Sequence, residues 1–262
     1  MRTNLLLGLQ APGSISDALS PDQYGNAFTK VYLDHASHGG NWGASLHPVD
    51  NGFPYGRDFS TGVSNAALIA LTNNGQAVEF ARKLTQMGID FYPMWLVNDK
   101  GIEGSGFGWG YKLPILFAGI MLNHNGMVHP PLYRTGTINN FPEDRWKSYG
   151  APVSGWPQGK PLWGTVDSER NECPPDLAGN GECTGQPAPY RICCSSFTWV
   201  GQALAARLMG ALDLWSHPAY FDYVDRWVGE PGSWLYGDTG NYGAIYGFGG
   251  QFVRDMWQTN RN

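Results

Sequence analysis

Three histidines near the start of the chain are the residues whose types and spacing point most directly to chemistry. His35, His38 and His47 lie within thirteen residues, with Asn41 and Trp42 between them. An imidazole can give or take a proton near neutral pH, and a hydrogen-bonding amide can stabilise a carboxylate. A single histidine is more often a hydrogen-bonded structural residue, but the cluster favours a site that moves protons.

A second group of candidates lies at two predicted helix starts. Arg57 precedes an alanine- and leucine-rich stretch, and Tyr111 and Lys112 end a glycine-rich run. Elimination from a uronate requires a group that neutralises the sugar carboxylate, a base for the C5 proton and an acid for the leaving oxygen. The candidates for this reaction are His35, His38, Asn41, His47, Arg57, Tyr111 and Lys112.

Hydrolysis of a glycosidic bond is the alternative chemistry, and it needs two carboxyl groups. These lie about 5–5.5 Å apart for retention and about 6.5–9.5 Å apart for inversion, which a sequence does not give. The candidate carboxylates are Asp34, Asp50, Asp58, Glu103, Asp222 and Asp225. Asp58 beside Arg57 is equally consistent with an ion pair, and Asp222 and Asp225 are equally consistent with a solvent-exposed helix face.

Other site types find less support in the sequence. Asp34, His35, His38 and His47 offer nitrogen and oxygen ligands, but Asp-His-x-x-His is not a usual zinc spacing. Residues 104–110 lack the third glycine of G-x-G-x-x-G, and no G-x-S-x-G occurs. We therefore expect no metal and no cofactor, and neither nucleotide-dependent nor serine-hydrolase chemistry.

Aromatic residues are abundant and suit the recognition of sugars. The chain has 11 tryptophans and 13 tyrosines, whose rings combine an apolar face with a polar group. Residues 104–110 alternate glycine with larger residues, and glycine lets a ligand approach the backbone closely. The candidates for substrate binding are Trp42, Phe107, Trp109 and Tyr242. The same composition also fits a large aromatic core, and the same alternation fits a structural loop.

The charge balance narrows the class of partner. The 262-residue chain has a formal net charge of −5, which disfavours general binding to nucleic acid or to an anionic membrane. Residues 113–122 form an apolar run that is too short to span a bilayer. We expect a polysaccharide substrate as the partner, no nucleic acid and no membrane, and the sequence leaves the oligomeric state open.

Four cysteines lie close together in the second half of the chain, at Cys173, Cys183, Cys193 and Cys194. An even number in so short a stretch indicates two disulfides and an oxidising compartment, so we expect a secreted or periplasmic protein. The adjacent pair is expected to bond to the other two cysteines, in either combination. Zinc is the alternative, but no C-x-x-C occurs. The disulfides would pin the end of a long loop region over residues 125–195.

Hydrophobic periodicity predicts about six helices and few strands. The helices are expected over residues 60–71, 76–87, 113–122, 196–215, 218–228 and 251–258. Ser60, Thr61 or Ser64 is expected to cap the first helix, and residues 89–97 are expected to be extended. The pattern favours one mainly α domain over residues 1–262, either whole or as a fragment of a larger protein, with long loops rich in glycine, proline and aromatic residues.

Four segments carry a likeness to a known family. They are Arg-Asp-Phe-Ser-Thr at 57–61, Gln-Met-Gly-Ile-Asp at 86–90, Lys-Leu-Pro-Ile-Leu-Phe-Ala-Gly at 112–119 and Phe-Asp-Tyr-Val-Asp-Arg-Trp at 221–227. Together they resemble secreted bacterial polysaccharide-degrading proteins of the alginate-lyase and heparinase-like (α/α) toroid group. The resemblance implies a toroid-like or partial toroid fold. It carries over no tyrosine–histidine–asparagine triad, and a complete toroid has more helices than the pattern here predicts.

Two classes of function are consistent with these patterns, and they make different predictions about the structure. A glycan-cleaving enzyme predicts that histidines, tyrosines and carboxylates converge on one cleft beside tryptophans. A non-catalytic glycan-binding or structural protein predicts an aromatic surface without acid–base groups. We favour the enzyme, and within it a lyase over a glycoside hydrolase.

Overall fold

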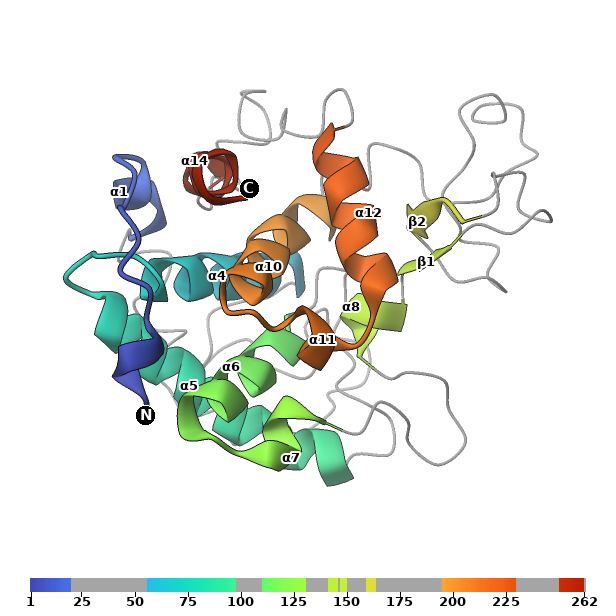
Figure 1. The fold of residues 1–262 in the computed structure, drawn as a ribbon, viewed down its shortest axis with the longest axis horizontal. Helices are drawn as coiled ribbons and strands as arrows, with labels where there is room; N and C mark the ends of the chain where they lie inside the picture. Colours follow the sequence, from blue (N-terminus) through green and yellow to red (C-terminus); the bar gives the residue numbers. More distant parts are fainter. Residues whose placement is uncertain are drawn as a thin grey trace.

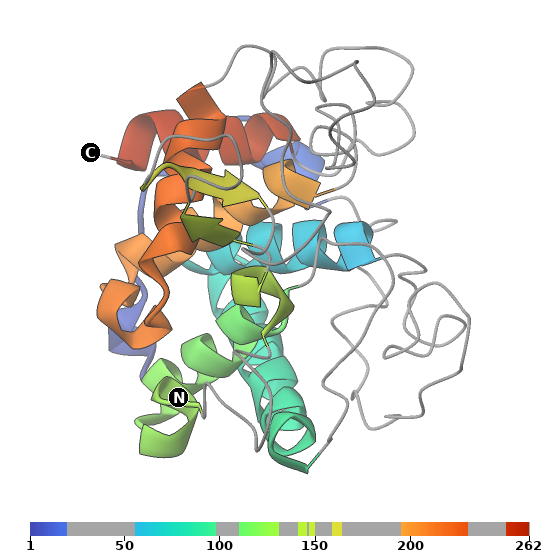
Figure 2. The same cartoon turned by 90° about the vertical axis from the view of Figure 1, so that its right-hand side faces the viewer.

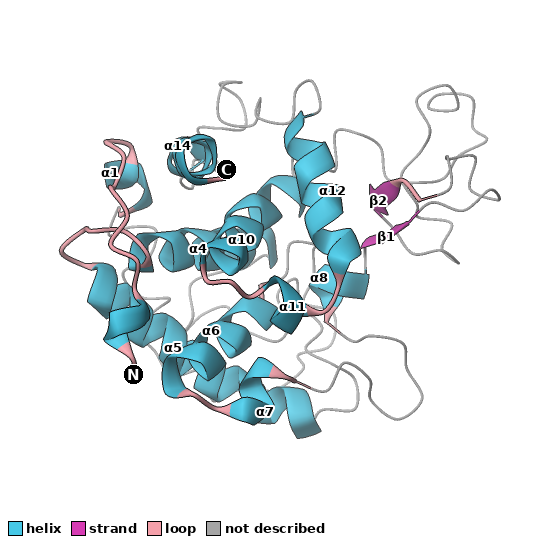
Figure 3. Ribbon diagram, viewed as in Figure 1, coloured by secondary structure: helices cyan, strands magenta, loops and turns pink. Residues whose placement is uncertain are grey.

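Helices account for most of the chain in the parts that the structure describes. The structure, a computed structural model, describes residues 1–19, 56–97, 110–130, 141–145, 147–149, 159–163, 195–229 and 250–261. Figure 1 shows these helices along the chain, and Figure 3 shows one small pair of strands beside them. The predicted mainly α class is confirmed for the described residues.

Six longer helices form the body of the described structure. They are α4 (Gly56–Ala70), α5 (Ala77–Val97), α6 (Lys112–Leu122), α10 (Ser196–Leu208), α12 (Pro218–Gly229) and α14 (Gly250–Asn260). The shorter helical elements are η1 (Thr3–Leu5), α1 (Ile15–Ala18), α7 (Asn125–Val128), α8 (Pro142–Arg145) and α11 (Leu212–Trp215). Strands β1 (Lys147–Tyr149) and β2 (Pro161–Trp163) pair antiparallel, with Lys147 opposite Trp163. The region 125–195 thus contains short elements where the sequence predicted a loop.

Helix α4 begins earlier than expected, and the predicted caps lie inside it. Ser60, Thr61 and Ser64 are all buried, so the prediction that one of them starts the helix is wrong. The hydroxyl groups of Ser60 and Ser64 bind Thr198 of α10 instead of the helix end. The Ser64 hydroxyl donates to the Thr198 carbonyl oxygen at 2.5 Å. Small side chains therefore occur here because α10 packs closely against α4.

Helix α5 continues through residues 89–97, and the predicted extended segment is wrong. The buried residues Leu84, Met87, Phe91, Met94 and Trp95 follow helical spacing, so one stripe of the helix faces the core. The expected helix over 76–87 ends just before Gly88. In the structure a Cβ at this glycine would lie 2.0 Å from the Pro114 carbonyl oxygen, so the glycine permits the close approach of α5 and α6.

Helix α6 is buried on nearly every side, as its apolar sequence predicted. Residues from Lys112 to Gly119 are all buried, and Asn123 ends the helix in the left-handed conformation at φ 58°. The Arg2 side chain donates to the Ile120 carbonyl oxygen near the end of the helix. This segment from the start of the chain therefore covers the end of α6.

The predicted helix over 196–215 is divided into two. Helix α10 ends at Leu208, Gly210 takes a left-handed φ of 65°, and α11 follows. Because glycine adopts this conformation without a steric penalty, it permits the change of direction. Helices α12 and α14 confirm the last two predicted helices, with aromatic and aliphatic side chains of both buried in the same core.

Helices α4, α6, α10 and α14 begin on the same side of the molecule. In Figure 2 they start on the right and run toward the left, while α5 runs downward from the end of α4. Phe91 of α5 contacts both Phe59 at the start of α4 and Tyr111 at the start of α6. No helix within the described ranges is both long and apolar enough to cross a membrane.

Candidate functional site

The starts of three helices meet and bring together segments far apart in the sequence. We call this the helix-start region, made up of Phe59 and Ser60 of α4, Tyr111 and Lys112 of α6, and Ser196 and Thr198 of α10. Each helix continues from a part of the chain that contains candidates: the histidines before α4, the glycine-rich run before α6 and the cysteines before α10. The tertiary fold therefore joins the ends of these three segments.

An aromatic cluster holds α4 and α6 together at this region. The ring centroids of Phe59 and Tyr111 lie 5.5 Å apart, and those of Phe91 and Tyr111 lie 5.2 Å apart. Tyr111 is buried. A Cβ at Gly110 would lie 3.2 Å from the Ser60 Cα, so the end of the glycine-rich run rests against α4. The backbone entering α6 thus has little room to shift.

A chain of hydroxyl and amide groups joins α4 to α10. The Gln202 side-chain amide donates to Ser60 Oγ at 2.7 Å, and Ser60 Oγ donates to Thr198 Oγ1 at 2.9 Å. Thr198 Oγ1 donates onward to the Ser195 carbonyl oxygen at 2.7 Å. Ser196 Oγ lies 2.6 Å from the Tyr223 hydroxyl. These bonds satisfy buried polar groups and fix the start of α10, two residues after Cys194.

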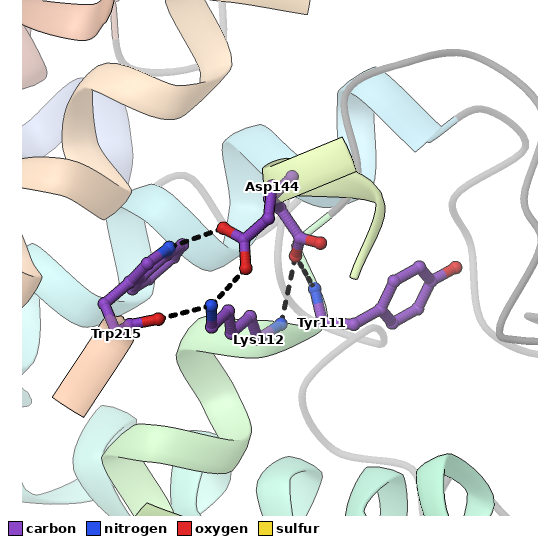
Figure 4. A network of polar contacts seen from close by, with 5 residues as sticks. Tyr111, Lys112, Asp144 and Trp215 are labelled. Atoms are coloured by element: carbon purple, nitrogen blue, oxygen red, sulfur yellow. Dashed lines mark hydrogen bonds and ion pairs between the residues drawn. The ribbon is translucent and has the colours of Figure 1, made fainter. Parts of the chain in front are cut away.

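A buried ion pair between Lys112 and Asp144 lies beside the start of α6 (Figure 4). We call these two residues, together with Glu143 and Trp215, the Lys112 network. Lys112 Nζ donates to Asp144 Oδ2 and, at 2.6 Å, to the Trp215 carbonyl oxygen. The Trp215 indole donates to Asp144 Oδ1 at 2.7 Å. Both carboxylate oxygens of Asp144 are therefore bonded, as a buried charge requires.

Glu143 uses its carboxylate to hold the backbone at the start of α6. Its Oε1 accepts from the amide N–H of Tyr111 at 2.5 Å and from that of Lys112 at 3.0 Å. Amide groups in the first turn of a helix have no partner within the helix and carry partial positive charge. The helix start therefore balances Glu143, while Lys112 and the Trp215 indole balance Asp144.

Burial controls the electrostatics of this network. The Lys112 and Asp144 side chains are both 0 % exposed. Removal from water lowers the pKa of Lys112, and the attraction of Asp144 opposes this shift. The Lys112 ammonium also lies 5.0 Å from the Trp215 ring and 5.3 Å from the Phe141 ring. Burial, with Glu143 and Asp144, raises the pKa of the nearby Tyr220 well above its usual value.

The structure brings two of the predicted pairs of site residues together. Arg57 and Asp58 lie in the first turn of α4, next to Phe59, whose ring contacts Tyr111. Only the backbone of Arg57 and Asp58 is described. Lys112 is wholly buried, and its ammonium is bonded to Asp144 and to the Trp215 carbonyl oxygen, so it is not accessible from solvent in this structure.

Most of the other predicted site residues lie outside the described residues. These are Asp34, His35, His38, Asn41, Trp42, His47, Asp50, Glu103, Phe107, Trp109, Tyr242 and the four cysteines, Cys173, Cys183, Cys193 and Cys194. Their predicted roles and the predicted disulfides therefore remain predictions. Among the described residues, no three histidine, cysteine or acidic side chains group in a way that could hold a metal ion.

Two of the predicted hydrolase carboxylates, Asp222 and Asp225, lie on α12. Asp222 is exposed and accepts from the Tyr149 hydroxyl at 2.6 Å. Burial first, and then the bond to Asp222, raises the pKa of Tyr149 to about 12. Asp225 binds Arg207 at 2.8 Å and Arg261 at 2.7 Å. Both carboxylates have local partners that account for their positions.

Sequence reasoning missed Glu143 and Asp144. The signal was present, because proline followed by two acids is typical of a helix start. That signal predicts the short helix α8 but not its partners, which lie more than thirty residues earlier and seventy residues later.

Comparison of the chain with models of known protein families, with curated proteins and with solved structures found no match. The description of the site therefore depends on the residues and contacts of this chain.

Proposed function

We propose that this chain is a carbohydrate-active enzyme that cleaves a uronate-containing polysaccharide by β-elimination, with its active site formed by the segments that directly precede the buried helix-start region in the chain. One observation carries the proposal: the starts of α4 and α6 meet through Phe59 and Tyr111. Arg57 directly precedes this contact in α4, and the glycine- and aromatic-rich run directly precedes it in α6. A cation, a glycine-rich segment that lets a ligand approach the backbone, and aromatic rings suit the binding of an acidic sugar.

The helix directions support a toroid-like fold for the proposed enzyme. Helices α4, α6, α10 and α14 run broadly from right to left in Figure 2, and α5, which follows α4 in the chain and packs against both α4 and α6, runs downward from the end of α4. An inner set of like-directed helices joined by returning helices is the arrangement that the proposed (α/α) toroid has. In the proposal, loops at the end where these helices begin carry the substrate-binding residues.

The proposed chemistry divides the candidates into two roles. His35, His38 and His47, with Asn41, supply proton transfer, and Arg57 neutralises the sugar carboxylate so that the C5 proton becomes acidic enough to remove. Tyr111 and Lys112 are buried and bonded, so we assign them to holding the site in shape. The rings of Trp42, Phe107, Trp109 and Tyr242 are proposed to bind the sugar rings.

The test is incubation of the purified protein with uronate-containing and neutral polysaccharides, followed by ultraviolet absorbance and reducing ends. Elimination creates an unsaturated, absorbing product, whereas hydrolysis creates reducing ends alone. The variants His47→Ala and Arg57→Ala are expected to lower kcat by about 10²–10⁴-fold. Arg82→Ala is the control, because Arg82 is exposed on α5 and pairs only with Glu79 among the described ion pairs. Equal activity in all variants would contradict the assigned roles.

Hydrolysis is the second candidate function, and the position of Asp58 favours it. Asp58 directly precedes Phe59, whose ring contacts Tyr111, and in this second proposal the Asp58 carboxylate is one of the two that hydrolysis needs. Reducing ends without absorbance, abolished by Asp58→Asn, would establish hydrolysis. Glycan binding without either product would leave a non-catalytic binding protein.

Export from the cell is part of the proposal, because it accounts for the cysteines. Cys173, Cys183, Cys193 and Cys194 are proposed to form two disulfides in a secreted or periplasmic protein. Mass spectrometry without reduction measures this directly. Four free thiols in protein isolated from its native compartment would contradict it.

A further inference from the structure

The first residues of α6 are bound by two side chains from another helix, α8. Consecutive residues Glu143 and Asp144 of α8 bind consecutive residues Tyr111 and Lys112 of α6. Glu143 takes the two backbone N–H groups, and Asp144 takes the side-chain ammonium. Since α8 is only four residues long, it is too short to be stable by itself, and this contact fixes it.

We propose that Glu143 is a positioning residue of the active site, and that it sets the backbone at the point where the glycine-rich run enters α6. The inference rests on the proposed function. Tyr111 is the N-cap of α6, and its side chain does not cap the helix. The carboxylate of Glu143 supplies that cap from a segment 31 and 32 residues further along the chain.

Asp144 keeps Glu143 in place. Its two oxygens are bound by Lys112 and by the Trp215 indole, so α8 is tied to both α6 and α11. Phe141, at the start of the same segment, stacks on Trp95 of α5 with ring centroids 3.6 Å apart. Glu143 is therefore held on both sides by neighbours that are themselves buried.

The position of the backbone at Tyr111 affects the proposed site directly. The preceding residue, Gly110, already lies against α4 near Ser60, so the cap and the packing together fix two consecutive residues. A shift of about 1 Å in groups that position a substrate can cost about 10²-fold in rate. Glu143 touches no substrate in this proposal and acts through the backbone it holds.

Two substitutions separate the reach of the Glu143 side chain from its charge. Glu143→Gln keeps an oxygen at the same distance and removes the charge. Glu143→Asp keeps the charge and withdraws it by one methylene. A positioning role predicts that Glu143→Gln retains most of the function and that Glu143→Asp and Glu143→Ala lose it. Glu79→Ala on the exposed side of α5 is the control.

Hydrogen exchange of the Tyr111 and Lys112 amides measures the cap without any substrate. We expect exchange in Glu143→Asp and Glu143→Ala to be at least about tenfold faster than in the wild type, because their amides lose the acceptor. Exchange in Glu143→Gln and in Glu79→Ala is expected to stay close to the wild type. Unchanged exchange in Glu143→Asp overturns the proposal, also if Glu143→Ala fails to fold.

Kinetics on the cleaved polysaccharide then separate positioning from mere stability. At a temperature where every variant is folded, Glu143→Asp is expected to lower kcat by about 10–100-fold with KM nearly unchanged. Faster exchange with a wild-type kcat overturns the proposal, because the cap would then be structural only. If the wild type cleaves no glycan, the proposed function fails. Exchange then decides only the second part of the inference, that Glu143 sets the backbone where the glycine-rich run enters α6, and wild-type exchange in Glu143→Gln with fast exchange in Glu143→Asp supports that part.

Discussion

Two clusters in this protein pair a basic side chain with an aspartate, but they differ in burial and in how far apart their members lie in the chain. The Lys112 network lies in the interior, where α6, α8 and α11 meet (Figure 1). The second cluster, which we call the Asp225 cluster, consists of Arg207, Asp225 and Arg261 and lies partly exposed beside α10 and α12. Both have close contacts, so distance alone does not tell them apart.

Burial and connectivity explain the difference between the clusters. Lys112 binds groups that are 32 and 103 residues away, whereas Asp225 binds groups 18 and 36 residues away. Breaking a buried pair leaves an uncompensated charge away from water, whereas a partly exposed charge regains water. The interior cluster therefore locks distant segments into one arrangement, and the outer cluster adds a modest stabilisation to elements that already pack together.

The largest expected effect comes from removing the charge of Lys112. Lys112→Met should lower the free energy of unfolding by about 3–5 kcal/mol, because Asp144 remains charged and buried. Urea denaturation followed by circular dichroism measures this loss. Adding Asp144→Asn to the same protein should restore most of it, since no buried charge is then unpaired. A loss below about 1 kcal/mol in the single variant would show that the two clusters are equivalent.

Added volume in the interior should also lower the free energy of unfolding. Gly88→Ala puts a methyl group against the Pro114 carbonyl oxygen, so α5 and α6 must move apart. The expected loss is about 1–3 kcal/mol, measured as the free energy of unfolding in urea. The matched change Gly229→Ala, at the end of α12, meets no atom of the described residues within 4 Å and should stay within about 0.5 kcal/mol of the wild type. Equal losses at both sites would contradict the contrast.

The outer cluster should respond weakly and with a clear dependence on salt. Asp225→Asn is expected to lower the free energy of unfolding by about 0.2–1 kcal/mol for each ion pair lost. The loss should shrink in about 1 M salt, where the screening length falls to about 3 Å. The loss from Lys112→Met should hardly change with salt, because buried charges are little screened. A salt-independent loss in Asp225→Asn would place both clusters in one class.

The last expected effect depends on pH and concerns Tyr149, whose hydroxyl donates to Asp222 on the exposed side of α12. Its pKa is raised from 10.0 to about 12, so between these pH values the folded state holds the proton more tightly than the unfolded state. The resulting stabilisation is present below about pH 10 and is lost as the pH rises toward 12. Phenolate absorbance of the wild type and of Asp222→Asn should show a lower Tyr149 pKa in the variant. The shift should be partial, because burial is the first cause.

Local pattern was sufficient for much of the fold. The apolar run of α6 and the hydrophobic spacing of α10, α12 and α14 predicted helices, since each pattern depends on neighbours within a few turns. Predictions failed where a residue serves a distant contact. The expected helix over 76–87 ends just before Gly88, and Ser60 or Ser64 is expected to cap a helix. In the structure these small residues lie inside helices and permit close packing of α5 on α6 and of α4 on α10.

The candidate site was also predictable only in part. The sequence indicated a junction at Tyr111 and Lys112, because these residues end a glycine-rich run and begin a buried helix. The roles of these side chains could not be read there. Asp144 and the Trp215 carbonyl group hold the Lys112 ammonium, and these partners lie in parts of the chain whose sequence says nothing about Lys112.

The helical class could be predicted from the amino-acid sequence alone, because hydrophobic spacing and helix propensity act over a few residues. The sequence also determined the charge, the aromatic content and the residue types available for chemistry. The contact between the starts of α4, α6 and α10, the capping of α6 by Glu143 and the burial of Lys112 became apparent only from the tertiary structure. Those facts depend on contacts between residues tens of positions apart, and such contacts form only when packing removes both partners from water.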